Sequence, residues 1–322
     1  MPLIENSSYD PSFFFKNRHC NTIYPSLFRK VEGVQYRRER MNTPDGDFLD
    51  LDWSTMGGNK LVIVLHGLEG NADRAYIRGI VKAMNLAGWD GMGINFRGCS
   101  GAPNLAARSY HSGETEDLDW VIQAIQKKNK YQQIALVGFS LGGNVAFKYA
   151  GERGNNLASE ISHVVAFSVP CDLESCSHEL DKWHNWIYLN RFLVTLKEKV
   201  VEKKDILAGK VDLERVRKAN SFFEFDDAVT APIHGFAGAL DYWRKSSCKQ
   251  FLSQLSINAL MINARDDSFL SEECYPTKIA ADSTKFTLEI PPNGGHVGFY
   301  SPDKNGLYWS DRRMAQFILE RE

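Results

Sequence analysis

A chain of 322 residues is long for one hydrophobic core, but it suits a single large domain that carries an insertion. Hydrophobic residues make up 43% of the chain and charged residues 24%, a globular composition that excludes collagen-like repeats, coiled coil and extensive disorder. The formal net charge is -2, and no segment gathers Lys and Arg densely, so we do not expect nucleic acid as a partner.

The spacing of the cysteines and the length of the apolar runs indicate the cellular compartment of the protein. The six cysteines are scattered and form no C-x-x-C pair, so we expect reduced thiols and a cytoplasmic protein. No secretory signal is visible, and the apolar runs are shorter than the ~20 residues that span a bilayer, so no stable membrane insertion is expected. Phe13 to Phe15 could touch lipid, but we prefer to interpret them as a buried N-terminal anchor. The sequence does not indicate an oligomeric state.

Apolar residues alternate along the chain between strand-like and helix-like spacing. Residues 34–41 and 48–53 flank the turn sequence Pro44-Asp45-Gly46 and predict an antiparallel hairpin. Further strands are predicted at residues 60–65, 90–95, 134–137, 163–168, 258–263 and 285–290. Helices are predicted at residues 74–87, from about 112–115 to 129, at 141–150 and from about 309, and Gly151 is predicted to end the third of them. This order predicts a mostly parallel sheet with helices on both faces.

The alternation stops between residues 171 and 251, where apolar residues are spaced as in helices and no convincing strand is found. We therefore predict one domain over residues 1–322 with a helical insertion at residues 171–251. This insertion is either a bundle packed on the core or a lid over an active site. The lid is favoured, because insertions at the carboxyl ends of sheet strands usually lie beside the binding site.

A candidate nucleophile lies in the sequence Gly138-Phe139-Ser140-Leu141-Gly142. The G-x-S-x-G pattern alone is weak because glycine is common, but here it follows the apolar run IALV and opens the helical pattern LGGNVAFKYA. A strand, a tight turn and a helix in this order hold a serine hydroxyl up at the edge of a sheet. We therefore predict Ser140 as a nucleophile. The alternative is a small residue in an ordinary tight turn.

A serine needs a base to remove its proton and an acid to orient that base. His296 is the one histidine beyond the last predicted core strand, in the glycine-rich turn PPNGGH, although a surface histidine beside a turn is an alternative. Asp266 and Asp267 both follow the predicted strand ALMIN. Asp267 is preferred, because a short residue and then two apolar residues follow it, as in the acid-bearing turn of serine hydrolases. Asp266 remains open.

An oxyanion hole is predicted from backbone N–H groups rather than from side chains. The sequence HGLEG follows the first buried strand, and the N–H of Leu68 in it would pair with the N–H of Leu141, the residue after the nucleophile. His66 in the same turn is interpreted as structural, hydrogen-bonded to its loop. No H-x-x-x-H or H-E-x-x-H spacing occurs, so neither a metal nor another cofactor is expected.

The chain carries the motifs HGLEG, NFRGCSG, YHSGETEDL, GFSLGGN, FDDAVTAP with HGF, and NARDDSF followed by GGH. Together these motifs resemble the YheT-like branch of the α/β-hydrolases, from about residue 17 to the C-terminus. The resemblance implies an α/β-hydrolase fold, a triad of Ser140, Asp267 and His296, and an oxyanion hole at Leu68 and Leu141. It also implies esterase or lipase activity, because relatives act on acyl glycerols, phospholipids or fatty-acid ethyl esters. The N-terminal membrane anchor common in animal relatives is not recognised here.

The predicted function is hydrolysis of a small-molecule carboxylic ester with a medium or long acyl chain, through an acyl-enzyme. Two alternatives remain: an acyltransferase with the same mechanism, and a non-catalytic ligand-binding protein of the same fold. His111, Glu114 and Glu116 of YHSGETEDL are interpreted as a helix start, because acidic residues are favourable at the positive end of the helix dipole. Arg97 is either an internal ion-pair partner or a substrate contact.

Overall fold

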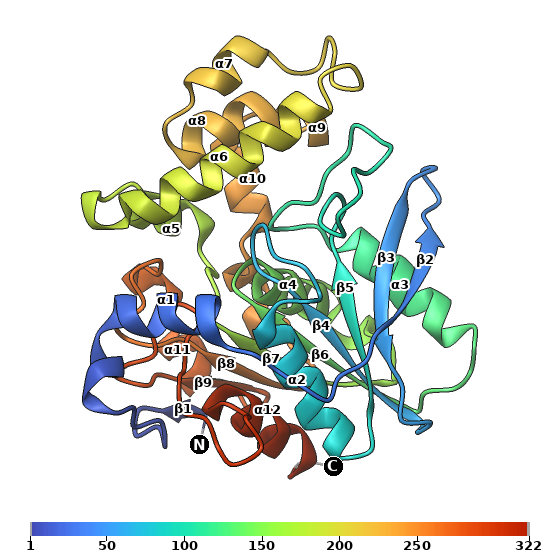
Figure 1. Cartoon of the computed structure of the whole chain (residues 1–322), viewed down its shortest axis with the longest axis vertical. Helices are drawn as coiled ribbons and strands as arrows, with labels where there is room; N and C mark the ends of the chain where they lie inside the picture. Colours follow the sequence, from blue (N-terminus) through green and yellow to red (C-terminus); the bar gives the residue numbers. More distant parts are fainter. Residues whose placement is uncertain (1, 321–322) are drawn as a thin grey trace.

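The structure, a computed structural model, describes residues 2–320. Within these residues nine strands form one sheet in the order β1-β9-β8-β7-β6-β4-β5-β3-β2. Strand β3 runs antiparallel to β2 and β5, and the other neighbours are parallel (Figure 1). The strands are β1 Leu3–Ile4, β2 Arg37–Asn42, β3 Phe48–Ser54, β4 Lys60–Leu65, β5 Asp90–Asn95, β6 Gln133–Phe139, β7 Ile161–Phe167, β8 Asn258–Ile262 and β9 Phe286–Glu289.

Helices cover both faces of this sheet because its central strands are apolar on both sides. Leu61, Ile63 and Leu65 of β4 face α3 and α4, whereas Val62 and Val64 face α2 and α12. The predicted fold class is therefore confirmed. The helices are α1 Arg18–Phe28, α2 Ala75–Leu86, α3 Glu116–Gln126, α4 Leu141–Arg153, α5 Leu173–Leu180, α6 Trp186–Glu202, α7 Leu213–Lys218, α8 Phe222–Phe225, α9 Ala231–His234, α10 Ala239–Ser246, α11 Thr277–Ala281 and α12 Trp309–Leu319.

The register of the parallel strands places the loops that carry the candidate residues at one edge of the sheet. Leu65 at the end of β4 is aligned with Gly138 near the end of β6. Phe139 in turn is aligned with Phe167, and Phe167 with Ile262 at the end of β8. The loop with Leu68, the turn with Ser140 and the loop with Asp267 therefore all begin at the same level, at the carboxyl ends of the strands.

Several predicted boundaries are wrong. Helix α3 ends at Gln126 rather than at about residue 129. The first hairpin strand begins at Arg37 rather than at residue 34. Gly151 does not end its helix, since α4 continues to Arg153 and Gly154 follows it with φ 50°. Gly151 is instead required for packing, because a Cβ there would lie 2.5 Å from the carbonyl oxygen of Phe251.

The expected burial of Phe13 to Phe15 is wrong for two of the three side chains. Phe13 is 91% exposed and Phe14 is 60% exposed, whereas Phe15 is buried and stacks on Tyr300 with ring centroids 3.8 Å apart. These residues form a single turn of 3₁₀ helix, Phe13–Lys16. With three residues per turn, consecutive side chains point about 120° apart, so one of them can face the core while the others do not.

The segment between β7 and β8 contains α5 to α10, and residues 168–257 contain no strand. In Figure 1 these helices lie together beyond one edge of the sheet. They have a hydrophobic cluster of their own, which includes Leu193, Val200, Phe225 and Trp243. Among residues 2–320, we find no helix whose length and apolar character would let it cross a membrane.

Candidate active site

Ser140 occupies a strained turn between β6 and α4. Its φ is 52°, in the left-handed region that residues other than glycine rarely adopt. The turn also packs tightly on β4, because a Cβ at Gly142 would lie 2.5 Å from the carbonyl oxygens of Leu65 and His66. The flanking glycines are therefore required, and the turn holds the Ser140 side chain at the carboxyl end of β6.

A chain of hydrogen bonds joins Ser140, His296 and Asp267. Nε2 of His296 lies 2.9 Å from Oγ of Ser140, and Nδ1 lies 2.9 Å from Oδ2 and 3.1 Å from Oδ1 of Asp267. The Asp267 side chain is fully buried, and its Oδ1 also accepts the N–H of Phe269 at 3.0 Å. A carboxylate at Nδ1 favours the tautomer with the proton on Nδ1, which leaves Nε2 free to accept the serine proton.

Asp266 points to a different partner. Its Oδ1 accepts the backbone N–H of Gly295 at 2.9 Å, and burial raises the pKa of its carboxyl group. The structure thus brings Asp267 to the imidazole and places Asp266 on the backbone of the loop that carries His296.

Three residues that the sequence did not indicate hold the His296 loop. Oγ1 of Thr22 accepts the N–H of His296 at 2.9 Å, and Oγ of Ser168 accepts the N–H of Val297 at 2.9 Å. The ring of Phe269 stacks on the imidazole with centroids 4.1 Å apart. Thr22 lies in α1, far from His296 in the sequence, and belongs to no recognisable motif, so no sequence signal could have identified it.

Leu68 and Leu141 lie beside Ser140 and His296 around one cavity. Leu141 is the first residue of α4, so its N–H has no acceptor within the helix. The loop with Leu68 passes close to the serine, since a Cβ at Gly67 would lie 3.2 Å from Cβ of Ser140. Two backbone N–H groups at these positions can stabilise negative charge on an oxygen bound between them.

His66 supports this loop as a neutral side chain. It is fully buried, its Nδ1 lies 2.7 Å from the carbonyl oxygen of Gly67, and its Nε2 accepts the N–H of Phe96 at 3.1 Å. Burial lowers the pKa of His66 to about 3, so at neutral pH the ring has its one proton on Nδ1. These contacts agree with a structural role.

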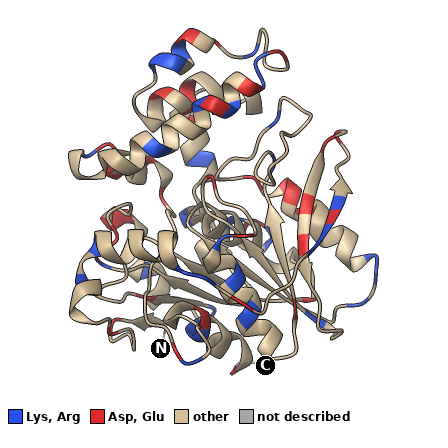
Figure 2. Ribbon diagram, in the orientation of Figure 1, with Lys and Arg blue, Asp and Glu red and all other residues tan. Residues whose placement is uncertain are grey.

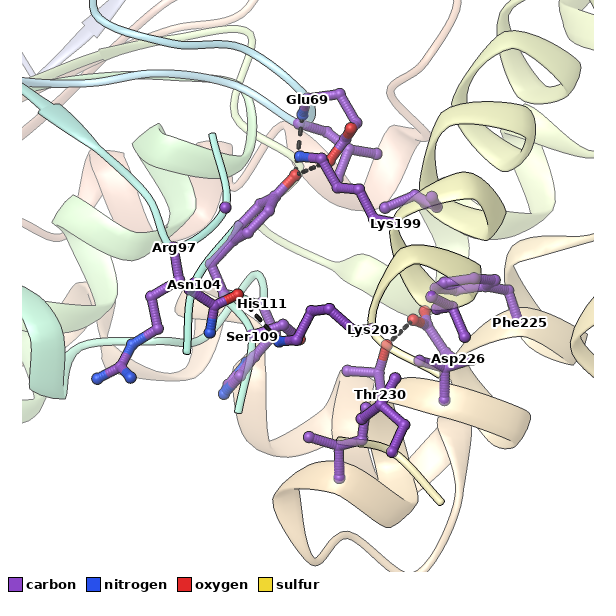
Figure 3. Close-up of a pocket in the computed structure, with 18 of the residues that line it drawn as sticks. Glu69, Arg97, Asn104, Ser109, His111, Lys199, Lys203, Phe225, Asp226 and Thr230 are labelled. Atoms are coloured by element: carbon purple, nitrogen blue, oxygen red, sulfur yellow. Dashed lines mark hydrogen bonds and ion pairs between the residues drawn. The ribbon is translucent and has the colours of Figure 1, made fainter. Parts of the chain in front are cut away.

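Glu69, which follows Leu68, connects the same loop to the helical insertion. It has φ 55°, and its N–H donates to the hydroxyl of Tyr110 at 2.9 Å. Its Oε1 accepts the Tyr110 hydroxyl at 2.6 Å and Nζ of Lys199 at 2.9 Å. Figure 3 shows Glu69 and Lys199 side by side, joined by a dashed line. Lys199 belongs to α6, so an ion pair links the insertion to the loop beside the nucleophile.

Two adjoining cavities lie between the sheet and the insertion. The first, about 100 Å³, is lined by Ser140 and His296. The second, about 130 Å³ and drawn in Figure 3, shares with it Leu68, Leu141 and Phe222. The lining of both cavities is largely apolar. To the first cavity the insertion contributes Leu173, Leu180, Phe192 and Trp243. To the second it contributes Leu196, Val200, Leu207, Val229 and Ile233.

Asp226 lines both cavities and is an ionisable group in a mostly apolar wall. It begins a short π-helix, Asp226–Thr230. Its Oδ1 accepts the hydroxyl of Thr230 at 2.6 Å and its Oδ2 accepts Nε1–H of Trp243 at 2.8 Å. Burial raises the pKa of Asp226 to about 6.

Arg97 is an internal ion-pair partner. Its guanidinium has no exposed surface and lies within 3.0 Å of carboxylate oxygens of Asp45, Asp47 and Asp117. This arrangement supports the interpretation of Arg97 as an internal ion-pair partner. It leaves Arg97 no free N–H group with which to contact a substrate.

The acidic residues before α3 form a helix start, as expected. Oε1 of Glu114 accepts the N–H of Glu116 at 3.0 Å and pairs with Arg108. Within residues 2–320, His111, Glu114 and His234 form a group whose ligand atoms lie within 4.8 Å of one another. These three residues do not fit a metal ion. Nδ1 of His111 accepts the N–H of Gly113, so the proton of the neutral ring is on Nε2. Nε2 is the atom that faces Glu114, and a nitrogen that carries a proton cannot bind a metal.

Comparison with known proteins identifies the family. A family model described as alpha/beta hydrolase fold matches residues 60–303, so the chain belongs to the α/β-hydrolases. It is 36% identical over 300 residues to an Escherichia coli (strain K12) protein named "Putative esterase YheT", with 91% of this chain and 87% of that protein covered. The predicted family resemblance is confirmed.

Two further likenesses agree with this assignment. The chain is 28% identical over 332 residues to a mouse protein named phospholipase ABHD3, with 98% of this chain and 79% of that protein covered. The solved structure of Pyrococcus furiosus esterase Pf2001 matches with a TM-score of 0.59 and 17% identity, covering 91% of this chain and 95% of that one. At this identity the structural match shows the fold alone.

Proposed function

We propose that the protein is a carboxylic ester hydrolase in which Ser140 is the nucleophile, His296 the base and Asp267 the acid that orients it. The observation that carries the proposal is the unbroken hydrogen-bond chain from Oγ of Ser140 through the imidazole to the buried carboxylate. The names of the Escherichia coli and mouse relatives, an esterase and a phospholipase, support the same class of reaction.

In the proposed mechanism, Oγ of Ser140 attacks the ester carbonyl carbon while Nε2 of His296 takes the hydroxyl proton. The carbonyl oxygen becomes an oxyanion between the N–H groups of Leu68 and Leu141. The intermediate collapses, and the alcohol leaves with the proton from Nε2. Water then attacks the acyl-enzyme, gives a proton to Nε2, and releases the carboxylic acid as the proton returns to Ser140.

A fluorophosphonate probe tests the nucleophile, because it phosphonylates an activated serine. We expect one labelled serine, and Ser140→Ala should abolish labelling and lower kcat for ester hydrolysis by up to ~10⁶-fold. Ser112→Ala is the matched control, since Ser112 lines the same cavity outside the hydrogen-bond chain. Full ester hydrolysis by Ser140→Ala would require another nucleophile.

We further propose that the helical insertion, residues 171–251, is a lid and that its apolar side chains bind the acyl chain. The two adjoining cavities support this, because the insertion supplies much of their lining and an acyl chain bound at Ser140 can extend from one into the other. Each added methylene that is buried stabilises the bound ester by about 0.8 kcal/mol. Esters with acyl chains longer than acetyl should therefore be the better substrates.

A chain-length series of p-nitrophenyl esters measures this preference as kcat/KM. Ile233→Trp narrows the cavity farther from Ser140 and should reduce activity on octanoate while leaving acetate nearly unchanged. Leu240→Trp, at an exposed position of α10 outside both cavities, should leave the series unaltered. A series that is fastest with acetate and slows with each methylene would contradict the proposed acyl site.

A further inference from the structure

A third cavity, about 420 Å³, lies between α1 and α6 and is lined by Ser140 and His296. Its sides include Ile23 and Leu27 from α1 and Ile187 from α6. These three side chains are also exposed, so apolar surface continues from inside the cavity onto the outer face of the molecule.

On the α1 side, this outer surface is a connected group of aromatic rings. Phe14 contacts Phe15, Phe15 contacts Tyr24, and Tyr24 contacts Phe28, with ring centroids 4.9 to 5.2 Å apart. Phe28 is 62% exposed and Phe13, beside Phe14, is 91% exposed. Phe15 is buried, and its contacts hold Phe14 and Tyr24 at the surface, although burial of these two rings would be favourable.

On the α6 side, Trp183 is 87% exposed, Trp186 63% and Ile187 68%. The two sides are joined, because Nδ1 of His19 in α1 lies 3.0 Å from the hydroxyl of Tyr188 in α6. We name this surface the apolar rim: Phe13, Phe14, Tyr24, Leu27, Phe28, Trp183, Trp186 and Ile187. Large exposed apolar patches on soluble proteins mark protein or membrane contacts.

Charge distinguishes between these two kinds of partner. Residues 11–31 include four basic side chains and no Asp or Glu, and residues 182–197 include three basic side chains and no Asp or Glu. Figure 2 shows the same pattern on the ribbon of α1. Arg29 is neutralised inside by Asp311, and Lys16 lies 3.7 Å from Asp10, which leaves Arg18 and Lys30 on this side. On the α6 side Lys182 pairs with Glu179, which leaves Arg191 and Lys197. The whole chain has a net charge of -2. Basic side chains beside exposed aromatic rings match an anionic lipid surface, whereas a second copy of the rim would bring like charges together.

We propose that the apolar rim docks on a lipid surface that carries anionic headgroups, with the cavity between α1 and α6 facing the lipid. In that orientation an ester chain can move from the lipid to Ser140 without crossing bulk water. This last step rests on the proposed function, whereas the docking itself does not.

Vesicle co-sedimentation tests the docking with the Ser140→Ala protein, so that turnover cannot consume the vesicles. Vesicles of phosphatidylcholine and phosphatidylglycerol in equal parts should bind it, and vesicles of phosphatidylcholine alone should bind it more weakly. Replacing Phe13, Trp183 and Trp186 together by Ser should weaken binding at least ~10-fold, and none of these three residues lines a cavity at Ser140. The matched control replaces Met56, Leu86 and Leu105 by Ser, three apolar residues outside the rim with exposures of 52 to 65%, and should bind like the parent.

The outcomes separate the docking from the catalysis. Equal binding by the rim variant and the control variant, or no vesicle binding by the parent, would overturn the proposed docking. A dimer in sedimentation equilibrium that the rim substitutions dissociate, without vesicle binding, would identify the rim as a protein interface and also overturn it. With Ser140 restored, the rim variant should still cleave a water-soluble p-nitrophenyl ester at the parental rate. Vesicle binding by a protein that cleaves no ester would instead overturn the proposed function alone.

Discussion

Two neighbouring carboxylates have different partners because adjacent residues in the loop after β8 point in different directions. Asp267 lies 2.9 Å from Nδ1 of His296, whereas Asp266 accepts the N–H of Gly295. The first contact acts on the protonation of the imidazole, and the second acts on the shape of the loop that carries it. Substitution by Asn keeps the size of each side chain, so it separates these two effects.

Asp267→Asn should lower kcat by about 10⁴-fold, because an amide does not hold the imidazole in the required tautomer or stabilise the imidazolium. Asp266→Asn should cost roughly tenfold or less, since it weakens only the support of the loop. The comparison is made by kcat measurements on the two folded variants, with folding checked by circular dichroism. If Asp266→Asn is the inactive enzyme and Asp267→Asn the active one, Asp266 becomes the proposed acid.

Part of the candidate site can be predicted from sequence because it is local. Ser140 is marked by two glycines, and His296 by its glycine-rich turn after the last core strand. The direction of Asp267 could not be derived, because it depends on tertiary contacts such as the hydrogen bond of Asp266 to Gly295. Thr22 and Phe269 were missed for the same reason, since they contact His296 from other segments of the chain.

At the scale of elements, α6 and the loop after β4 are coupled by one partly buried ion pair, Glu69 with Lys199. Glu69 has φ 55°, a conformation that a non-glycine residue keeps only when its contacts hold it there. Lys199 and Tyr110 supply those contacts. Because Glu69 follows Leu68 directly, release of Lys199 should loosen the proposed oxyanion hole.

Lys199→Met should therefore lower kcat by about tenfold, equivalent to about 1.4 kcal/mol, with a smaller change in KM. Lys199→Arg, which keeps the charge, should recover part of the activity. The control is Lys197→Met, whose Nζ donates to the carbonyl oxygen of Arg217 within the insertion. Steady-state kinetics with a short ester measure both constants. A rise in KM alone would indicate that Lys199 contributes to substrate binding rather than to the loop.

The element order was largely predictable, because the central strands are buried on both faces and read as short apolar runs. Strand β1 was not predicted, since it has two residues, Leu3–Ile4, and is formed by pairing with β9 at the far end of the chain. Helix α1 was also missed. It includes Pro25, a residue that usually ends or kinks a helix, and it exposes the apolar side chains of Leu27 and Phe28.

At the scale of the whole molecule, the sheet and the insertion meet at a boundary that buries ionisable groups. His66 and His234 are held neutral, and burial lowers their pKa values to about 3 and about 4. Asp226 is affected in the opposite sense, with its pKa raised to about 6. The sheet layer and the insertion each have their own hydrophobic cluster. His234 of the insertion packs on His111 with ring centroids 4.5 Å apart, so a group whose charge depends on pH lies at their boundary.

These pKa values predict how stability changes with pH. An unfolded histidine has a pKa near 6.5, so between pH 6.5 and about 4 the unfolded chain binds a proton that folded His234 does not. The free energy of unfolding must therefore fall as pH decreases through this window, and His66 adds to the fall down to about pH 3. Asp226 opposes it, because the folded chain binds its proton from about pH 6 downward, above the pKa of the unfolded carboxyl group.

His234→Gln removes a side chain that takes up a proton when the chain unfolds. The decrease in the free energy of unfolding between pH 7 and pH 5 should therefore become smaller by about 2 kcal/mol. Asp226→Asn should make the same loss larger, because the proton uptake that opposes it disappears. Urea unfolding at the two pH values, with both variants and the parent, measures these differences directly. Since the two substitutions change the pH dependence with opposite signs, a general destabilisation of the boundary cannot reproduce the pattern. Parallel curves for all three proteins would show that neither group is titrated differently in the folded and unfolded chains.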